Sequence, residues 1–378
     1  MKRRDFNRTL VAATGAMLLS DLSASGVVAA RDSGEPAQIS TAADAGSLTD
    51  VEGLKVGHWT AKQRPTGCTV VLCEKGAVAG VDVRGGAPGT RETDLLNPIN
   101  TVQQIYGLVL SGGSAYGLDT ASGVMRYLEE KGIGFGMGHS MGEPKTANRI
   151  VVPIVPAAIL FDLSVGEDWK IRPTAESGYQ ASQAASTGKV AEGNVGAGAG
   201  ATIGKMFGGK FAMKGGLGTA SLRVRSTGIV IAAMAAVNAV GDIYDQRTGQ
   251  IVAGARTEDG KGFRNAIAQM RAGYLVVMPE GGTNTTIGVV ATNAKLNKDE
   301  ATKVAQMAHD GYARAINPTH TPADGDTIFS IATGTSSVRV NQGTIGALAA
   351  DVMAQAILRA ATQAEGIPGY PSYSDLHK

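Results

Sequence analysis

The chain has 378 residues, 43% of them hydrophobic, and a formal net charge of +2. This near-neutral balance gives no support to a nucleic-acid-binding protein or to one that docks on an anionic membrane surface. The length suffices for one large hydrophobic core or two modest ones.

The first 30 residues have the pattern of an export signal. A twin-arginine sequence, Lys2-Arg3-Arg4-Asp5-Phe6, precedes a short apolar run over residues 9–20, and Val28-Ala29-Ala30 suits cleavage directly after it. This apolar run is shorter than the roughly 20 residues that span a bilayer, and we expect no later apolar segment of that length without interruption. The pattern predicts a twin-arginine signal peptide over residues 1–30 and a periplasmic protein. Residues 31–47 are small and polar, which predicts a disordered lead-in.

From residue 48 onward, short β-rich runs alternate with longer segments of helical periodicity, which predicts an α/β architecture. The expected strands are 68–73, 78–83, 105–110, 229–237, 274–278, 287–292 and 327–333. The expected helices are 118–131, 175–185, 298–316 and 345–361. Asn297 can cap the third helix while Glu300 reaches back to it. No linker divides residues 48–378, so we expect one catalytic domain.

The two cysteines, Cys68 and Cys73, lie in the first expected strand. Their spacing of five places them on opposite faces, which predicts buried thiols and neither a disulfide nor a metal pair. The five histidines show no metal-ligand spacing, so we expect no catalytic metal.

Three near-motifs lack the residues that their chemistry needs. The segment Gly198–Lys205 resembles a phosphate loop, but Met206 replaces the magnesium-binding Ser or Thr. Gly196-Ala197-Gly198 resembles a dinucleotide fingerprint without a clear strand before it or a suitable acid after it. Gly112-Gly113-Ser114-Ala115-Tyr116 resembles a nucleophile elbow with Tyr116 in place of the second glycine, so Ser114 is a weak candidate nucleophile.

The most informative segment is Pro279-Glu280-Gly281-Gly282-Thr283-Asn284-Thr285-Thr286, which leads into the strand expected at 287–292. On its own it also fits an ordinary loop entering a strand. If the Asn284–Thr285 bond breaks, Thr285 gains a free α-amino group beside its hydroxyl, so one residue supplies both base and nucleophile. The ordinary pKa of an α-amino group is about 7.7–8, so an unprotonated fraction exists near neutral pH.

Other polar groups occur in glycine-rich or turn-like settings: Lys205, Asn238 and the Asp324-Gly325-Asp326 unit. Each also fits an ordinary role, as a solvated lysine, a strand-ending residue and a tight turn. In a hydrolase, a fixed amide such as Asn238 stabilises an oxyanion by about 3 kcal/mol. The lysine and the two aspartates could hold the amine, tune its pKa and pass protons, and the sequence leaves open which residue does which.

Together these segments resemble the self-processing aminopeptidases and amidases that include β-peptidyl aminopeptidases, L-aminopeptidase/D-esterases and 6-aminohexanoate-oligomer hydrolases. The resemblance runs in order from about residue 48 to residue 361. Its most specific pieces are Arg84-Gly85-Gly86-Ala87-Pro88-Gly89, Gly112-Gly113-Ser114-Ala115-Tyr116-Gly117-Leu118, Asn284-Thr285-Thr286 and His320-Thr321-Pro322-Ala323-Asp324-Gly325-Asp326-Thr327.

This resemblance implies a four-layer α/β/β/α sandwich that cleaves itself between Asn284 and Thr285 into associated α and β chains. It implies Thr285 as the N-terminal nucleophile and Asn238 as the oxyanion donor. It also implies an active-site lysine at Lys205 and an acidic pair beside the nucleophile, at Asp324 and Asp326. Homo-oligomers of αβ units are implied, and no metal or organic cofactor.

Two departures from the family pattern bear on the substrate. The 6-aminohexanoate-oligomer hydrolases have a tyrosine where this chain has Phe161, and Tyr116 could approach the site from another segment, so both are candidate substrate contacts. The acid with which some aminopeptidases hold the substrate amine is absent, with Ala157 and Ala158 in that neighbourhood.

We therefore expect an amide-cleaving N-terminal-threonine hydrolase, most simply an aminopeptidase on short peptides or on β- or D-aminoacyl amides. Three alternatives stay open at this point. They are an endo-amidase on linear ω-amino acid oligomers, an acyltransferase of the ornithine acetyltransferase type, and a non-catalytic binding protein.

Overall fold

The structure is a computed structural model, and it describes residues 46–136, 150–274 and 282–377. The expected signal peptide, nearly all of the lead-in and residues 275–278 of the fifth expected strand lie outside the described residues.

The central sheet has nine strands and consists of two halves that share one long strand, β2. Residues 67–72 of β2 pair with β1 and β4, a register shift follows, and residues 78–83 pair with β16. One half therefore holds β1, β4, β7 and β3, and the other holds β16, β14, β11 and β10. The strands are β1 (Lys55–Thr60), β2 (Gly67–Val83), β3 (Thr90–Arg91), β4 (Ile105–Ser111), β7 (Ala157–Ile159), β10 (Leu217–Arg223), β11 (Val230–Asn238), β14 (Thr285–Thr292) and β16 (Thr327–Ala332).

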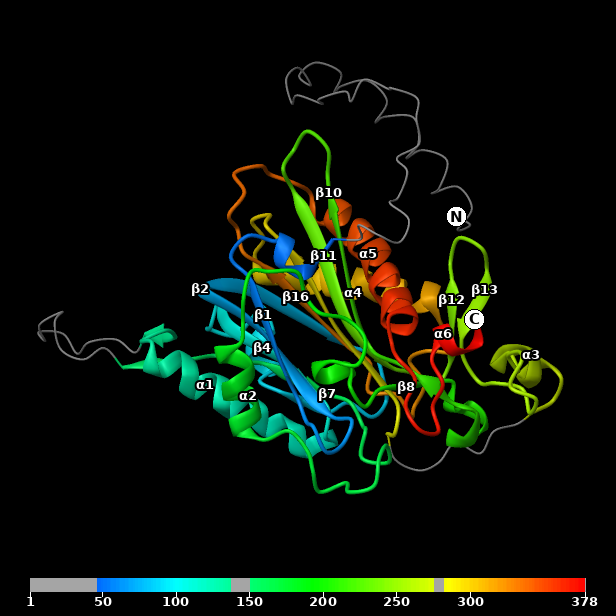
Figure 1. The fold of residues 1–378 in the computed structure, drawn as a ribbon. Helices are drawn as coiled ribbons and strands as arrows, with labels where there is room; N and C mark the ends of the chain where they lie inside the picture. The colour runs from blue at the N-terminus through cyan, green and yellow to red at the C-terminus, as the bar shows by residue number, and fades with distance from the viewer. Residues whose placement is uncertain (1–45, 137–149, 275–281, 378) are drawn as a thin grey trace, which may run out of the picture. The chain divides into compact units, whose positions relative to one another are not determined.

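Helices cover the outer face of each half. Helices α4 (Lys298–Ala315) and α5 (Gln342–Thr362) pack on the half that contains β11 and β14, whereas α1 (Thr120–Glu130) and α2 (Ala175–Gln183) pack on the half that contains β1 and β4 (Figure 1). The remaining elements are short: β5 (Phe135–Gly136), β6 (Val151–Val152), β8 (Thr202–Ile203), β9 (Met213–Lys214), β12 (Asp242–Asp245), β13 (Gln250–Ala253), β15 (Ile316–Asn317), α3 (Ala266–Arg271) and α6 (Tyr373–Leu376).

Side-chain alternation along the strands builds one core on each side of each half-sheet. Along β11, Ile231 and Ala233 face α4 and α5, whereas Ala232 and Met234 face the other half-sheet. A third apolar cluster lies between the first half-sheet and α1 and α2. Three cores in sequence require four layers, so the predicted α/β/β/α sandwich is confirmed, and all the described residues belong to one compact unit.

The structure contains most of the expected elements close to their expected bounds. The strands expected at 68–73 and 78–83 are one strand, β2, since the chain crosses from one half-sheet to the other without a turn. The predicted cap of α4 is present, with Asn297 Oδ1 accepting from Glu300 N–H at 2.9 Å. Strands β1 and β10 were missed, because both mix glycine and polar residues with few apolar ones and are held by pairing with β2 and β11.

The prediction of two buried thiols on opposite faces of the strand is confirmed. Cys68 points toward α1 and α2, and Cys73 points between the half-sheets. Both are free and buried, and burial raises the pKa of the Cys73 thiol to about 12. Neither thiol is therefore a ready nucleophile at neutral pH.

Helix α5 corrects the expectation about later apolar segments. Its 21 residues are long and apolar enough, by length and composition, to cross a membrane. Its apolar side chains pack against α4, β10 and β11 as part of the core. Core burial thus accounts for its hydropathy.

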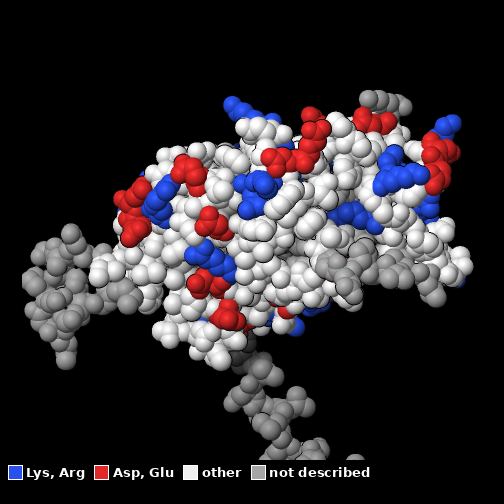
Figure 2. Space-filling view, turned by 90° about the horizontal axis from the view of Figure 1, so that it is seen from below, with Lys and Arg blue, Asp and Glu red and all other residues white. Residues whose placement is uncertain are grey.

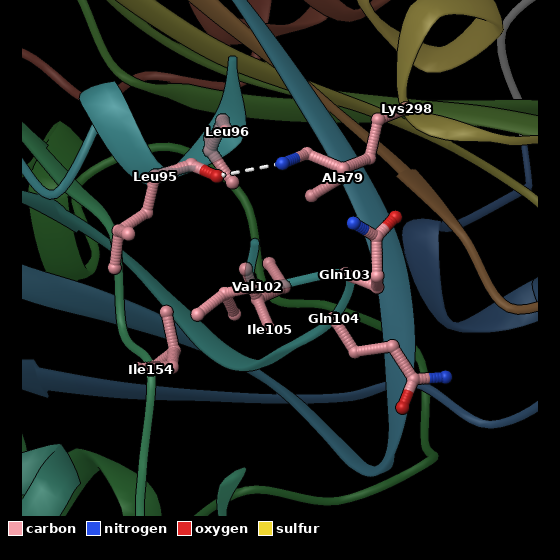
Figure 3. A pocket seen from close by; sticks show the side chains of 9 residues that line it. All are labelled: Ala79, Leu95, Leu96, Val102, Gln103, Gln104, Ile105, Ile154 and Lys298. Atoms are coloured by element: carbon pink, nitrogen blue, oxygen red, sulfur yellow. Dashed lines mark hydrogen bonds between the residues drawn. The ribbon is translucent and has the colours of Figure 1, made fainter. Parts of the chain in front are cut away.

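Charged groups on the described surface are mixed in sign, and on the face in Figure 2 acidic and basic side chains are interspersed. Lys298 points inward, and its Nζ donates to Leu95 O at 3.0 Å and to Asn100 O at 2.8 Å (Figure 3). It lies beside a small cavity that Leu96, Val102 and Ile105 help to line. Lys298 therefore joins the loop before β4 to α4 through hydrogen bonds. None of the candidate site residues lines this cavity.

Candidate active site

Neighbouring strand ends bring together residues that are far apart in the sequence. Thr285 is the first residue of β14 and Asn238 is the last residue of β11, and the antiparallel register places them directly opposite each other. On the other side, β14 runs parallel to β16, and an isolated parallel bridge joins Asn284 to Asp324. Asp326 directly precedes β16. Five of the predicted site residues thus lie at one end of the sheet.

The intact Asn284–Thr285 peptide bond lies in contact with the Thr285 hydroxyl. Thr285 Oγ1 donates to the Asn284 carbonyl oxygen, and both residues are buried. The same oxygen accepts the Gly325 N–H at 3.0 Å. A hydroxyl group therefore lies beside a carbonyl that a fixed backbone donor polarises, which is an arrangement that suits acyl transfer.

Gly325 lies close to the Thr285 hydroxyl. A Cβ at this position would lie 2.8 Å from Thr285 Oγ1 and 2.7 Å from Ala87 O. Real Cβ atoms do not come so close to backbone oxygen, so the chain must shift if residue 325 has a side chain. The glycine of the Asp-Gly-Asp unit is thus required by the close approach to Thr285 and Ala87 and not only by the turn.

We expect Gly325→Ala to stop self-cleavage or slow it at least about 100-fold, because the methyl displaces both the Thr285 hydroxyl and the donor to the Asn284 carbonyl. Pulse-chase labelling followed by denaturing gel electrophoresis measures the rate. Gly262→Ala is the matched control, since the nearest atoms to its Cβ, those of the Thr257 side chain, would lie 3.8 Å away. Equal rates for wild type and Gly325→Ala would contradict this interpretation.

Asn238 is fully buried and its amide is held at both ends. Its Oδ1 accepts from Lys205 Nζ at 2.7 Å and from Thr202 N–H at 3.0 Å. Its Nδ2 donates to Phe161 O at 3.0 Å and to Thr283 O at 3.3 Å. These partners fix which end of the amide donates, so a preorganised N–H faces the segment that precedes Thr285.

Lys205 is not a solvated loop lysine. Its ammonium also donates to Asn238 O at 3.0 Å and to Thr283 O at 3.1 Å. Burial lowers the pKa of Lys205 to about 7, although the Asp324 carboxylate acts in the opposite direction. Near neutral pH this amine can therefore both donate and accept a proton.

The two aspartates have different environments. Burial, and then the charge of Asp326, raise the pKa of Asp324 to about 6, while its Oδ2 accepts from Thr321 N–H and Oγ1 at 2.9 and 2.7 Å. Burial also acts to raise the pKa of Asp326, but hydrogen bonds from His320 and from Thr286 N–H outweigh it and the net pKa is lowered. Asp326 is thus the permanently charged member, and Asp324 titrates near working pH.

The two weaker candidates differ in position. Phe161 meets the site through its backbone, because its carbonyl accepts from Asn238 Nδ2. Tyr116 is 52% exposed, with the Arg172 guanidinium 3.7 Å from its ring centroid. No hydrogen bond within the described ranges joins Tyr116 to the other site residues, so its part in substrate binding stays a prediction.

Sequence reasoning missed three side chains that hold the site: Thr202, Thr321 and His320. Thr321 and His320 lie within the motif that carries the family resemblance, and the Thr-x-x-Asp spacing of Thr321 and Asp324 is a signal of a local side-chain cap. Thr202 has no such signal. Across the described part of the chain, no group of three or more His, Cys, Asp or Glu side chains is arranged to hold a metal ion.

Comparisons with known proteins agree with this geometry. The family model described as peptidase family S58 matches residues 46–373. An aminopeptidase of Mycobacterium bovis that is described as uncharacterized is 42% identical over 355 residues, which covers 87% of this chain and 97% of the relative. A 6-aminohexanoate-oligomer endohydrolase of a Kocuria species is 30% identical over 326 residues, covering 82% of this chain and 85% of the relative.

Solved structures match the fold. A beta-aminopeptidase of a Burkholderia species superposes with a TM-score of 0.61 at 21% identity, over 84% of this chain and 86% of the other. The L-aminopeptidase D-Ala-esterase/amidase of Ochrobactrum anthropi, described as a variant of the Ntn hydrolase fold, gives a TM-score of 0.61 at 19% identity, over 86% and 88%. The four-layer sandwich is thus of the Ntn hydrolase type.

Proposed function

Because this chain belongs to peptidase family S58 and is a hydrolase of that family, we propose that it cleaves itself between Asn284 and Thr285 and then opens amide bonds with Thr285 as an N-terminal nucleophile. One observation carries the proposal. The Thr285 hydroxyl contacts a carbonyl oxygen that also accepts the Gly325 N–H.

Self-cleavage begins when Thr285 Oγ1 attacks the Asn284 carbonyl carbon. Collapse of the tetrahedral intermediate breaks the C–N bond and leaves Asn284 esterified to Thr285 Oγ1, with the former amide nitrogen as a free α-amine. Water then hydrolyses this ester, which gives an Asn284 carboxylate and a free Thr285 hydroxyl. The Gly325 N–H stabilises the oxyanion of the first step, because it already binds the oxygen that becomes negative.

Turnover uses the new amine. The α-amine of Thr285 takes the proton from Oγ1, which attacks the substrate carbonyl, and the amine product leaves with a proton as the acyl-enzyme ester forms. Water releases the acid in the second half-reaction. Asn238 Nδ2 is the proposed oxyanion donor, and Lys205 and Asp324, with pKa values of about 7 and 6, are suited to pass protons near neutral pH.

The proposed substrates are short peptides or β- or D-aminoacyl amides, attacked from a free amino end. The mycobacterial relative at 42% identity is described as an aminopeptidase, which supports this choice. A second candidate, endo-cleavage of linear ω-amino acid oligomers, has an observation in its favour. Thr283 O accepts from both Lys205 Nζ and Asn238 Nδ2, so the site already binds a carbonyl one residue before the scissile bond.

A panel of chromogenic amides tests the substrate class. We expect hydrolysis of L-, D- or β-aminoacyl amides with a free amine at least about tenfold faster than that of the matched N-acetylated amides. An ω-amino acyl pair, free and acetylated, belongs in the same panel. Turnover of only the acetylated members would reverse the choice and make the protein an endo-amidase.

Two further parts of the proposal concern the product and the place. We propose hydrolysis rather than acyl transfer because export separates the protein from biosynthetic acyl acceptors. An added amine acceptor should therefore not raise the rate at which an acyl donor is consumed. The twin-arginine pattern supports a periplasmic enzyme, and the family resemblance supports a homo-oligomer of αβ units. Because the chain belongs to a hydrolase family, we set aside the alternative of a non-catalytic binding protein.

A further inference from the structure

His320 lies beside the acidic pair and is unassigned by the proposed chemistry. Its Nδ1 is 2.8 Å from Asp326 Oδ2, and its backbone N–H donates to the same oxygen at 3.0 Å. The other oxygen of Asp326 accepts the Thr286 N–H at 2.8 Å. Asp326 therefore connects His320 directly to the residue that follows the nucleophile.

The Asp326 carboxylate determines that the Nδ1 atom of the His320 ring carries a hydrogen. An ionised carboxylate can only accept, so Nδ1 carries a hydrogen. Among the described residues Nε2 has no hydrogen-bond partner, although it is buried. Asp326 is thus the hydrogen-bond partner that orients the ring, which donates its Nδ1–H to that carboxylate.

The surroundings of the ring hold no free charge. His309 and Tyr312 of α4 lie with ring centroids 4.7 and 5.8 Å from that of His320. Burial lowers the pKa of His309 to about 4, and burial raises that of the Tyr312 phenol, so both are neutral in the working range. From β2, the Asp82 carboxylate lies 3.7 Å from His309 Nε2 and accepts from the Arg84 side chain, which neutralises it. Among the residues that the structure describes, Asp326 is the one ion that directly contacts His320.

We propose that His320 is a positioning residue of this enzyme, which through its Nδ1–H keeps Asp326 ionised and aimed at the Thr286 amide at working pH. This inference rests on the proposed function of the site. It gives a role to a side chain that touches none of the reacting atoms and acts through Asp326.

The direction of the effect follows from the carboxylate that accepts the His320 hydrogen bond. Loss of the His320 donor leaves the charged form of Asp326 less stable, so Asp326 takes up a proton at a higher pH. Activity that needs the Asp326 charge is then lost at a higher pH on the acid side. The His320 Nδ1–H is one of four donors to the Asp326 carboxylate. Loss of one hydrogen bond to a charged group corresponds to a rise in its pKa of roughly half a unit to one unit.

The backbone at His320 provides a matched pair of variants. Its φ is +57°, which both glycine and asparagine adopt readily. His320→Gly removes the donor, whereas His320→Asn places its side-chain N–H where Nδ1 lies. A difference between these two variants therefore reports the donor and not backbone strain.

The test is the pH dependence of kcat/KM on the best amide for wild type and the two variants, with thermal melts to verify folding. We expect the acid limb of His320→Gly to lie roughly half to one pH unit above that of wild type, with activity recovering at alkaline pH. His320→Asn should follow wild type, and added imidazole should move the His320→Gly limb back, since the ring site is partly open, with 19% of the side chain exposed.

Superimposable limbs for wild type and His320→Gly would overturn the proposal, as would equal losses in both variants at every pH. If His320→Gly fails to fold, nitrogen NMR of histidine-labelled wild type decides: a ring that carries a hydrogen on Nδ1 supports the assignment, and one protonated at Nε2 alone overturns it. Failure of the proposed function is distinguishable, because wild type itself would then hydrolyse no amide.

Discussion

Thr285→Ala should give a single uncut chain with no amide hydrolase activity. The substitution removes the hydroxyl that contacts the Asn284 carbonyl, so neither the self-cleavage ester nor the acyl-enzyme can form. Loss of a nucleophile of this kind lowers kcat by about 10⁴-fold or more. Denaturing gel electrophoresis and a chromogenic amide assay measure the two effects on the same preparation.

Thr285→Ser is the matched control, since it keeps the hydroxyl and loses only a methyl group. It should yield two fragments and retain measurable turnover. A Thr285→Ala protein that still splits between residues 284 and 285 would show that another group attacks this bond, and intramolecular attack by Thr285 would have to be abandoned.

Asn238→Ala should reduce turnover about 100- to 1,000-fold and self-cleavage much less. In the uncut chain the oxygen of the scissile bond accepts from Gly325 N–H, not from Asn238, whose Nδ2 donates to Phe161 O and Thr283 O. Self-cleavage thus keeps its oxyanion donor in this variant, whereas turnover loses the proposed one. Single-turnover kinetics on the cleaved protein, beside the rate of appearance of the fragments, separates the two steps.

Thr202→Val provides the comparison for this variant. It removes a hydroxyl that donates to Asn238 Oδ1 at 3.3 Å but keeps the Thr202 N–H that donates at 3.0 Å, so the amide stays in place. We expect kcat to change by less than about fivefold, because the free energy lost is at most that of one typical hydrogen bond. An equal loss of both rates in Asn238→Ala would contradict the division of labour between Asn238 and Gly325.

Much of the framework could be predicted because local pattern and burial coincide in it. Strand β14 and helix α4 were evident from β-branched residues and from the Asn297 cap, and both are buried elements of the described fold. The four-layer order was implied by the family resemblance and not by periodicity, since a strand that serves two half-sheets, such as β2, looks like two strands in the sequence.

The site shows where such reasoning stops. The residue types at Thr285, Asn238 and Asp326 suggest a hydrolase site. Their proximity depends on the register between β11 and β14 and on the parallel pairing of β14 with β16, which no local sequence pattern encodes. The state of Lys205 depends on burial by distant segments, so the sequence could not predict its lowered pKa. His320 was overlooked because its role passes through Asp326.

The new chain start at Thr285 is the feature on which the account depends. Intact mass spectrometry, with stepwise N-terminal sequencing of freshly purified, fully active protein, tests it most directly. We predict two polypeptides, one of which begins Thr285-Thr286-Ile287 with a free α-amine. Full activity in a preparation that contains only the uncut chain would contradict the account.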